Sequence, residues 1–243
     1  MKRALTSRCV VAALAGAFVL AGCGEARQTD QITAAAPSPV AATAAATMTL
    51  ADVAKACRAS GSSPGVAIVD RELRDANTSV TLPDCILHLE KGADVWLNNV
   101  RIGGGVLNIH DRETAASANR VELQRVTVNA AALLVELNDP DDSINAEATQ
   151  VTTARGIGVR VAGTRNGTNT GGTITFVDST LLATGREAPV HVLASEHSGT
   201  ITLVETTLDT QGSLTVLAAT CEARRGGRKL DCSTAAAEAG LRP

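Results

Sequence analysis

The sequence predicts an all-β solenoid, in which short parallel strands wind in coils around a narrow apolar interior. A strand-like segment recurs along the chain, and its apolar residues alternate with polar ones, as in a strand with one buried face. The composition agrees with this fold, because hydrophobic residues make up 44% of the 243 residues and aromatic residues only 1%. Aliphatic side chains suit a narrow interior in which rings rarely fit.

Five segments carry the repeat. Each reads apolar, variable, apolar, then two variable residues and an apolar or small one, and successive segments begin 26, 25, 28 and 27 residues apart. Each segment leads to a second alternating run. A helical solenoid would need apolar residues at i, i+3 and i+4 over longer segments, and the consensus of a leucine-rich repeat is missing. An antiparallel β-sandwich is the competing fold.

Equivalent residues of successive coils stack about 4.8 Å apart in such a solenoid. The alignment predicts two inward columns, Val95, Val121, Ala146, Ile174 and Ile201 in the first and Leu97, Leu123, Ala148, Phe176 and Leu203 in the second. It also predicts two outward columns, Trp96, Glu122, Glu147, Thr175 and Thr202 in the first and Arg101, Thr127, Thr152, Thr180 and Thr207 in the second.

Two bends around a pair of strands, followed by a third strand, resemble the coil of a right-handed parallel β-helix. Over residues 84–218 the repeat is similar to the pectate-lyase-like superfamily. The resemblance implies a right-handed parallel β-helix of about five to six coils. Polysaccharide lyases of this fold pair calcium-binding acids with a basic residue that abstracts a proton, and the hydrolases cluster Asp residues on a strand face.

A solenoid exposes strand edges at both ends, so caps are expected there. Thr49, followed three residues later by Asp52, predicts the start of a short capping helix over 50–59, which ends near Gly61. The loop between Cys221 and Cys232 is expected to cover the opposite end.

The N-terminus has the pattern of an export signal. Lys2, Arg3 and Arg8 precede an apolar run of 11 residues from Val10 to Leu20, which is too short to span a bilayer but fits a secretory signal. The next residues, Leu20-Ala21-Gly22-Cys23, resemble the lipobox of bacterial lipoproteins. The resemblance implies cleavage before Cys23 and acylation of this cysteine; an ordinary signal peptide with a chance cysteine is the alternative. Gly24 resembles the outer-membrane sorting pattern of Gram-negative lipoproteins.

The chain therefore divides into a signal peptide over residues 1–22, the lipidated Cys23 with a flexible tether over residues 23–47, and a β-helix domain with its caps over residues 48–243. A tether of this length reaches roughly 25–30 Å from its anchor. We expect a bacterial cell-envelope protein, lipid-anchored and facing the periplasm or the surface, in the outer membrane if the cell is Gram-negative.

Cysteine usage fits an exported protein, because Cys57, Cys85, Cys221 and Cys232 leave an even number in the domain. Four cysteines allow three pairings. Proximity in sequence favours Cys57–Cys85 and Cys221–Cys232. Metal ligation is the alternative, although no close CxxC spacing supports it.

Three groups of residues are candidates for chemistry. Asp139, Asp141 and Asp142 bring together oxygen ligands of the kind calcium prefers, although the sequence favours a solvated acidic turn here. Glu122 and Glu147, in adjacent coils, are the candidate catalytic acid and base, with surface pairing to nearby arginines as the alternative. The four histidines, His88, His110, His191 and His197, are expected to share no column and no metal spacing.

Candidate binding residues are the basic run of Arg224, Arg225, Arg228 and Lys229, which suits an anionic glycan or lipid headgroup, and the single tryptophan, Trp96. A solvated charge run is the alternative for the basic residues. Loss of Lys2, Arg3 and Arg8 with the signal would lower the formal net charge from −3 to −6. With so few aromatic rings, that balance argues against nucleic acid as a partner.

The sequence thus predicts a binding or structural surface module with no cofactor, held at the membrane by its lipid and in contact with an envelope polysaccharide or protein. The alternative is a small carbohydrate-active enzyme, a polysaccharide lyase or hydrolase. Its site would lie at Glu122, Glu147 and the loops over 138–142 and 162–172.

Overall fold

The computed structural model describes residues 46–111, 117–161, 171–194, 199–218 and 220–230. They belong to one compact unit, Ala44–Pro243. The predicted signal peptide and lipobox with Cys23, nearly all of the tether, most of the loop over 162–172, and Cys232 and His197 lie outside the described residues.

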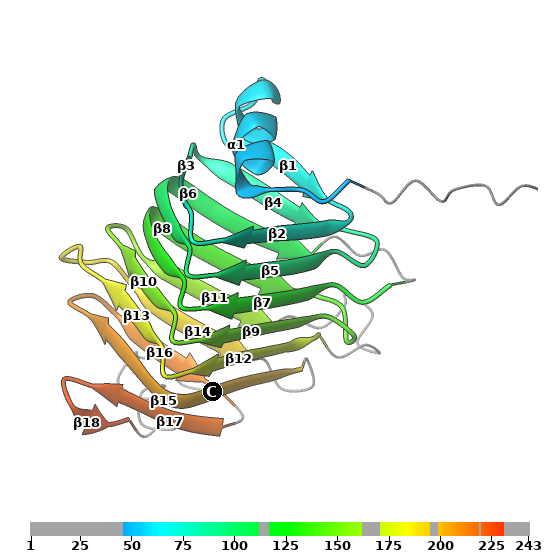
Figure 1. Cartoon of the computed structure of the whole chain (residues 1–243). Coiled ribbons are helices and arrows are strands. Elements are labelled where there is room, and N and C mark those ends of the chain that lie inside the picture. Colours follow the sequence, from blue (N-terminus) through cyan, green and yellow to red (C-terminus); the bar gives the residue numbers. More distant parts are fainter. Residues whose placement is uncertain (1–45, 112–116, 162–170, 195–198, 219, 231–243) are drawn as a thin grey trace, which may run out of the picture. The chain divides into compact units, whose positions relative to one another are not determined.

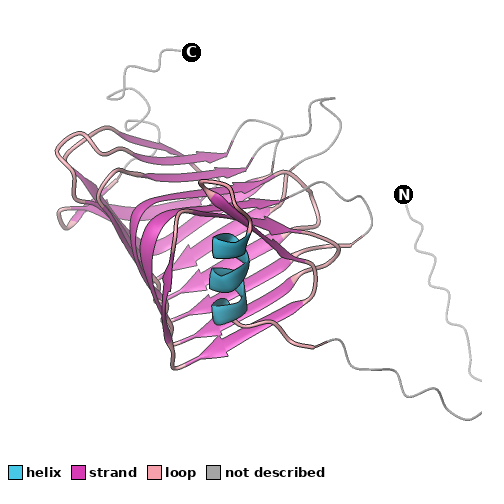
Figure 2. Ribbon diagram, turned by 90° about the horizontal axis from the view of Figure 1, so that it is seen from above, coloured by secondary structure: helices cyan, strands magenta, loops and turns pink. Residues whose placement is uncertain are grey.

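The domain is a parallel β-solenoid of about six turns with one short helix near its N-terminus, as the repeat predicts (Figure 1). Each coil contributes one strand segment to each of three faces, which enclose the interior in the view of Figure 2. Face A holds β2 (Glu72–Ala76), β5 (Asp94–Asn98), β7 (Arg120–Gln124), β9 (Ser143–Glu147), β12 (Thr173–Val177) and the start of β15 (Thr200–Thr210).

Three long strands, β6 (Arg101–Asp111), β8 (Thr127–Leu137) and β15, bend from one face to the next. Face B holds β3 (Ser79–Leu82), the first parts of β6 and β8, β10 (Gln150–Thr153), β13 (Thr180–Ala183) and the end of β15. Face C holds β1 (Gly65–Val69), β4 (Cys85–Leu89), the second parts of β6 and β8, β11 (Ile157–Val161), β14 (Val190–Ala194) and β16 (Leu214–Leu217).

The inward columns of face A confirm the aliphatic stacks, with one correction at β9. The first column is Val95, Val121, Ile144, Ile174 and Ile201, and the second is Leu97, Leu123, Ala146, Phe176 and Leu203. The alignment that placed Ala146 and Ala148 in these columns is wrong by two residues in this coil. The same shift puts Gln150, not Thr152, beside Thr127 in the outward column of face B.

Ala148 lies at a bend, not in a strand, because the corner between faces A and B is built on a left-handed residue. Its φ is +48°, and the equivalent residues of the other coils have φ between 46° and 54°. The N–H of Ala148 donates to the carbonyl of Val177 one coil on, at 3.0 Å. The other left-handed corner residues are Asn77, Asn99, Arg125, Asp178 and Glu205.

The residue after each left-handed corner points inward. Val100 and Val126 take this place in the early coils, and Thr149, Ser179 and Thr206 take it in the later ones; all five are buried. The buried hydroxyls are satisfied locally, since Ser179 Oγ donates to the Val177 carbonyl at 2.8 Å and Thr206 Oγ1 to the Val204 carbonyl at 3.0 Å. At this corner a backbone carbonyl is in reach of each of these two inward hydroxyls, which offsets the cost of burying them.

The helix α1 (Leu50–Ala59) covers the first coil, as predicted. Its capping box joins Thr49 and Asp52, and the N–H of Leu50 donates to Asp75 Oδ2 at 2.5 Å. Asp75 occupies the inward position that Leu97 takes in the next coil. At the end of this inward column, a carboxylate therefore binds the N-terminus of α1. A disulfide between Cys57 of α1 and Cys85 of β4 fixes the cap, which confirms one of the two expected pairings.

The opposite end carries a small hairpin of β17 (Thr220–Arg225) and β18 (Arg228–Lys229). The two strands are antiparallel, and Gly226 and Gly227 between them both have positive φ, as a tight hairpin turn requires. Cys221 lies on β17, but its expected partner Cys232 lies outside the described residues, so this pairing stays a prediction.

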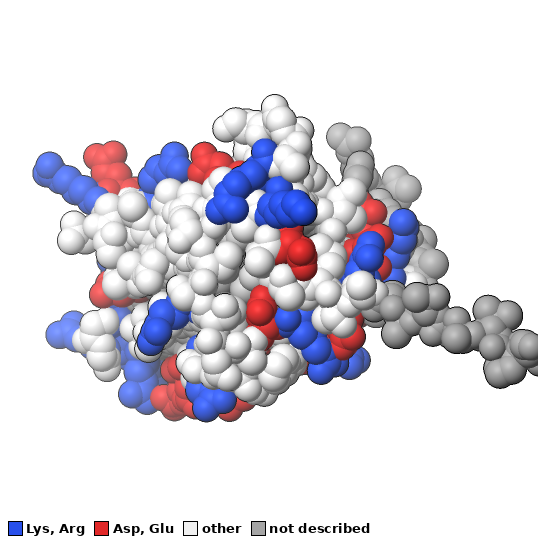
Figure 3. Space-filling model, turned by 45° about the horizontal axis from the view of Figure 1, so that its top comes forward, with Lys and Arg blue, Asp and Glu red and all other residues white. Residues whose placement is uncertain are grey.

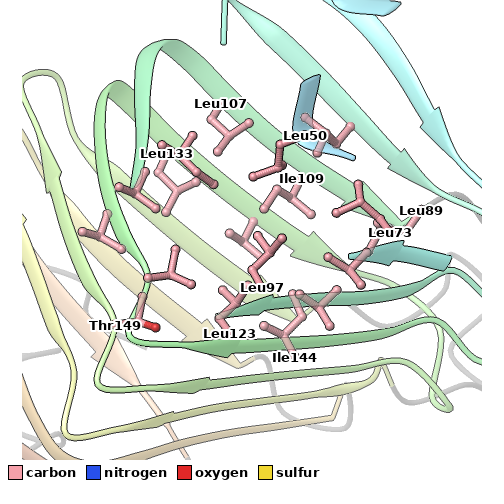
Figure 4. Close-up of a pocket in the computed structure, with 18 of the residues that line it drawn as sticks. Leu50, Leu73, Leu89, Leu97, Leu107, Ile109, Leu123, Leu133, Ile144 and Thr149 are labelled. Carbon is pink, nitrogen blue, oxygen red and sulfur yellow. The ribbon is translucent and has the colours of Figure 1, made fainter. Parts of the chain in front are cut away.

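The interior is not completely filled. A cavity of about 80 Å³ lies beneath α1, lined by aliphatic side chains such as Leu50, Leu73, Leu97 and Leu123, with Thr149 as its polar member (Figure 4). An apolar cavity of this size offers water few hydrogen-bond partners and stays dry. Phe176 packs inward and Trp96 outward, as the alternation predicts.

The corrected register makes a prediction for two alanines two residues apart. Ala148→Gly relieves a left-handed conformation and should stabilise the domain by about 0.5–1 kcal/mol. Ala146→Gly removes a buried methyl from a strand and should destabilise it by about 1 kcal/mol or more. Urea unfolding of the two variants measures both changes; destabilisation by both to a similar degree would contradict the register of β9.

Candidate functional site

The longest connections of the solenoid leave it at one corner, between faces C and A. The segments after β6, β8, β11 and β14 all lead there to the next face A strand. We call this edge the loop corner. Loops on a rigid scaffold often carry function, which makes the polar residues at the loop corner candidates for a site.

Three polar side chains are buried together at the loop corner. Asp111 ends β6 at an inward position, in register with Leu89 of the coil before. Only 1% of Asp111, 3% of Asn119 and 1% of Asp142 is exposed. Two carboxyl groups thus stand in the interior of the solenoid, which requires that their oxygens find partners.

Asn119 supplies most of these partners. Its Nδ2 donates to Asp142 Oδ2 at 3.0 Å and to Asp111 Oδ1 at 3.2 Å, while its backbone N–H donates to Asp142 Oδ1 at 2.6 Å. Its Oδ1 accepts from the N–H of Ala93 at 2.9 Å. The N–H of Asn138 donates to Asp111 Oδ2 at 3.3 Å. One amide therefore connects three successive coils at the place where their loops depart.

The pKa of Asp111 is raised to about 7. Burial is the largest cause, and the charge of the neighbouring Asp142 carboxyl is the second. Burial also raises the pKa of Asp142, against the hydrogen bonds from Asn119 that lower it. The hydrogen bond between the two carboxyls raises the pKa of Asp111 and lowers that of Asp142, as expected if Asp111 donates the proton.

A carboxyl group that stays protonated near neutral pH has the acidity that a general acid needs. Asp111 lacks the second requirement, access to a substrate, because it is 1% exposed and surrounded by protein donors. The arrangement is that of a structural polar cluster, in which a shared proton offsets the repulsion between two buried carboxyls. Sequence reasoning missed it, although Asp111 stands where the alternation of β6 calls for an apolar residue.

A shallow hollow of about 220 Å³ lies on the surface beside this cluster, lined by Asp94, Asn119, Arg120, Asp141 and Ser143 together with small residues. The predicted calcium ligands do not converge on it. Asp142 turns inward, and Asp139 Oδ1 accepts from the N–H of Asp141 at 3.1 Å, as in a local turn. Within the described part of the chain, no group of three or more His, Cys, Asp or Glu residues is arranged to hold a metal ion.

The predicted acid–base pair is also not assembled. Asn145, not Glu147, is in register with Glu122, and its Nδ2 donates to Glu122 Oε1 at 2.9 Å. Glu147 is in register with Gln124 instead. The correction follows from the two-residue shift at β9, which moves Glu147 away from the position beside Glu122. Neither glutamate lines this hollow of about 220 Å³, and neither lines the second surface hollow, which lies on face C.

Trp96 points outward on face A, but its ring is not a free platform. The guanidinium of Arg74, one coil before, lies 5.9 Å from the ring centroid. Arg74 is itself held by Glu72 and lies 3.9 Å from Asp94. A ring with a cation over it contributes a cation–π contact to the surface instead of a stacking site for a sugar.

Two of the four basic residues at the C-terminal hairpin are engaged by the solenoid. Arg224 forms an ion pair with Glu205 at 2.9 Å, and Arg225 donates to the Thr210 carbonyl at 2.9 Å. Arg228 and Lys229 are exposed. On the side of the molecule seen in Figure 3, basic and acidic side chains are interspersed and form no single-sign patch.

Face C has the most apolar outward surface. All three large hydrophobic residues that are exposed among the described residues lie there, Ile68 at 45%, Leu134 at 38% and Leu217 at 42%. Between them lies a hollow of about 370 Å³ floored by Gly156 and Gly158 and bordered by Leu134, Pro189, His191 and Leu193. We call it the β11 hollow.

Histidines gather on the same face, which corrects the expectation that they share no column. His88 and His110 are in register on β4 and β6, with ring centroids 5.8 Å apart and the rings edge to face. His191 stands on β14 of the same face. The second alternating run of each repeat carries this signal, and the columns predicted from the first segment do not include it.

No protein-family model, curated protein or solved structure matched this chain. Among the described residues, α1 is short and amphipathic, and no helix has the length and hydropathy to cross a membrane. The site therefore has to be judged on its geometry. Face C is the candidate contact surface, and the loop-corner cluster is a structural element.

The loop-corner cluster predicts how stability depends on pH. The pKa of Asp111 is about 7 in the folded protein against its usual value of 3.8, so the unfolded chain releases this proton first as pH rises. The stability that the protonated cluster confers is full below about pH 4, falls by about 1.4 kcal/mol per pH unit above it, and levels off near pH 7.

Asp111→Asn should remove this slope and make the domain more stable than the wild type at pH 8, because the neutral amide never ionises beside Asp142. Chemical unfolding at several pH values between 4 and 8 measures it. Asp141→Asn, at an exposed turn position, is the matched control and should keep the wild-type slope. An Asp111→Asn slope equal to that of the wild type would show that Asp111 does not hold the proton.

Proposed function

We propose that this chain is a lipid-anchored extracytoplasmic β-solenoid that acts as a binding or structural surface module of the bacterial cell envelope. The N-terminal basic residues, the apolar run from Val10 to Leu20 and the lipobox-like Leu20–Cys23 support the anchor. The Cys57–Cys85 disulfide supports export, since disulfides persist in oxidising compartments. The acyl chains would make the membrane its first partner.

The observation that carries the binding role is the exposed apolar surface of face C. Exposed apolar side chains around a hollow are typical of contact surfaces, and Leu134, Pro189 and Leu193 border the β11 hollow on this face. The parallel ladder holds the outward side chains of face C at fixed spacing on a rigid scaffold. An envelope polysaccharide or protein is the class of partner we propose, and the negative net charge argues against nucleic acid.

The alternative proposal is a small carbohydrate-active enzyme, a polysaccharide lyase or hydrolase related to the pectate-lyase-like superfamily. The raised pKa of Asp111 is the one observation in its favour. The separation of Glu122 from Glu147 and the burial of Asp111 and Asp142 weigh against it, because the described part of the chain offers no exposed pair of convergent acids.

The anchor is tested by replacing the cysteine that would carry the lipid. Cys23→Ala should abolish labelling with radioactive palmitate and move the protein from the membrane to the soluble fraction. Cys9→Ala, inside the predicted signal peptide, is the matched control and should keep both the label and the membrane location. Unchanged labelling of Cys23→Ala would refute lipidation at this site.

The contact role of face C is tested in living cells with a photo-crosslinking amino acid. Placed at Leu134, it should give a discrete crosslinked product on irradiation. Placed at Gln150, an outward and exposed position on face B, it should give none. Equal yields from the two positions would contradict the assignment of the contact surface to face C.

A further inference from the structure

The outward residues of face C form two columns along the solenoid axis. The first runs Val66, Ile86, Asn108, Leu134, Gly158, His191 and Thr215, and the second runs Ile68, His88, His110, Glu136, Arg160, Leu193 and Leu217. The second column carries its two opposite charges side by side near the middle. An adjacent pair of opposite charges can match an inverted copy of itself.

The two charges lack partners within the described chain. Glu136 on β8 and Arg160 on β11 are in register on neighbouring strands, yet neither takes part in an ion pair within 4.0 Å among the described residues. Arg160 is exposed and Glu136 half-buried. Two unpaired opposite charges at the centre of an apolar face are therefore available to a partner that presents the same charges in reverse order.

A second copy of this chain presents that reverse order. In a two-fold symmetric interface, each contact of residue i with residue j is repeated as j with i. A two-fold axis between β8 and β11, parallel to the strands, places Glu136 of one copy opposite Arg160 of the other, twice. We propose that face C docks on face C of a second copy in this arrangement, with the two solenoids antiparallel; the inference rests on the proposed contact role of face C.

Shape agrees with the charges. The same axis places Leu134 of one copy over Gly158 of the other, at the floor of the β11 hollow of about 370 Å³. Leu134 is 38% exposed and its Cδ1 lies over Gly158 of its own chain, so the Leu134 side chains of both copies meet at the hollow. A β-carbon at Gly158 would lie 2.8 Å from Leu134 Cδ1 of its own copy, so the hollow depends on glycine at this position.

The polar neighbours also match. Asn108 of one copy faces His191 of the other, in the second coil from the axis on either side. Both side chains are polar and partly exposed, so this contact places a polar group opposite a polar group.

The area of face C sets the strength of the contact. The axis brings six of the seven strands of face C opposite each other, and strands of about 17 Å stacked six deep at about 4.8 Å cover roughly 500 Å² on each copy. A total of roughly 1,000 Å² lies at the lower end of specific protein interfaces, so we expect a reversible dimer with a dissociation constant on the order of 1–100 μM. Two copies tethered to one membrane would meet at a raised effective concentration.

Other occupants match the face less well. A lipid surface favours Trp and Tyr at the headgroup level, and neither column contains an aromatic ring other than histidine. The carboxylate of Glu136 would be repelled by anionic headgroups. A polysaccharide would gain little without a ring to stack on. Only a second copy pairs both central charges.

Charge-reversal substitutions test the interface. The full chain is purified in detergent, and the molar mass of the particle is measured by light scattering over a range of protein concentrations. Glu136→Arg and Arg160→Glu should each weaken dimerisation about tenfold or more, because like charges then face each other. The double exchange restores opposite charges and should recover the wild-type dimer to within about threefold. Arg101→Glu on face B is the control and should dimerise like the wild type.

A monomeric wild type at about 100 μM would overturn the inference, since this area and charge match predict association at that concentration. So would a dimer that neither single exchange weakens, or one that the double exchange fails to restore. The mass of the product crosslinked from Leu134 tells a failed dimer from a failed surface module. A product with another envelope component, in place of twice the mass of this chain, overturns the dimer and leaves the contact role of face C in place, whereas no product refutes both.

Cysteine trapping tests the same geometry in cells that express two differently tagged copies. One copy carries Glu136→Cys and the other carries Arg160→Cys. Under mild oxidation, a disulfide should form between the two introduced cysteines and join the two differently tagged copies. Gln150→Cys with Thr180→Cys, which are outward neighbours on face B, is the matched control and should not crosslink the copies. Equal crosslinking by the two pairs, or crosslinking by the control alone, would contradict the proposed axis.

Discussion

The structure depends on the hydrogen bonds that each coil makes to the next. Parallel strands pair through evenly spaced N–H and carbonyl groups, and here the corners continue the pairing, as the N–H of Ala148 shows by bonding to the Val177 carbonyl one coil away. This constraint fixes which residues face inward in every coil and accounts for a row of left-handed residues that would be costly elsewhere. It also requires caps, because an end coil would leave its groups unpaired; α1 with the Cys57–Cys85 disulfide covers one end and the β17–β18 hairpin lies at the other.

The same stacking explains where polar groups enter the interior and what they do there. Hydroxyls stand at the left-handed corner, where a carbonyl is always in reach, and the Asp111–Asn119–Asp142 cluster stands where the loops depart and the ladder is interrupted. A carboxyl pair in that position is tolerated because one amide binds both members and a proton is retained between them. Outward side chains follow the same register. Each outward column of face C therefore holds its side chains at fixed positions that a partner can match.

Much of this architecture was predictable, because the signals are local. The capping box at Thr49 and Asp52, the alternation of strands and the proximity of Cys57 to Cys85 each rest on a few neighbouring residues. The alignment failed at β9 because this strand is poor in large residues, and Ala146 and Ala148 satisfy the pattern in either of two registers. Only the backbone distinguishes them, since alanine gives no sign of a left-handed conformation. That single shift removed Glu147 from the position beside Glu122. The β11 hollow and the buried cluster depend on contacts between coils, and no single segment of sequence contains them.

A surface module built this way presents equivalent side chains at a constant spacing of one coil. Its three faces differ in chemistry. The central claim is therefore the stack itself. Spin labels on the outward column of face B measure it most directly, with one label at Ser79 and a second at Thr127, Thr180 or Thr207 in turn. The account predicts that the distance grows by about 4.8 Å for each coil between the labels, and hence reaches roughly 24 Å for Thr207. Distances that fail to grow in proportion to the coil number, as an antiparallel sandwich would give, would contradict it.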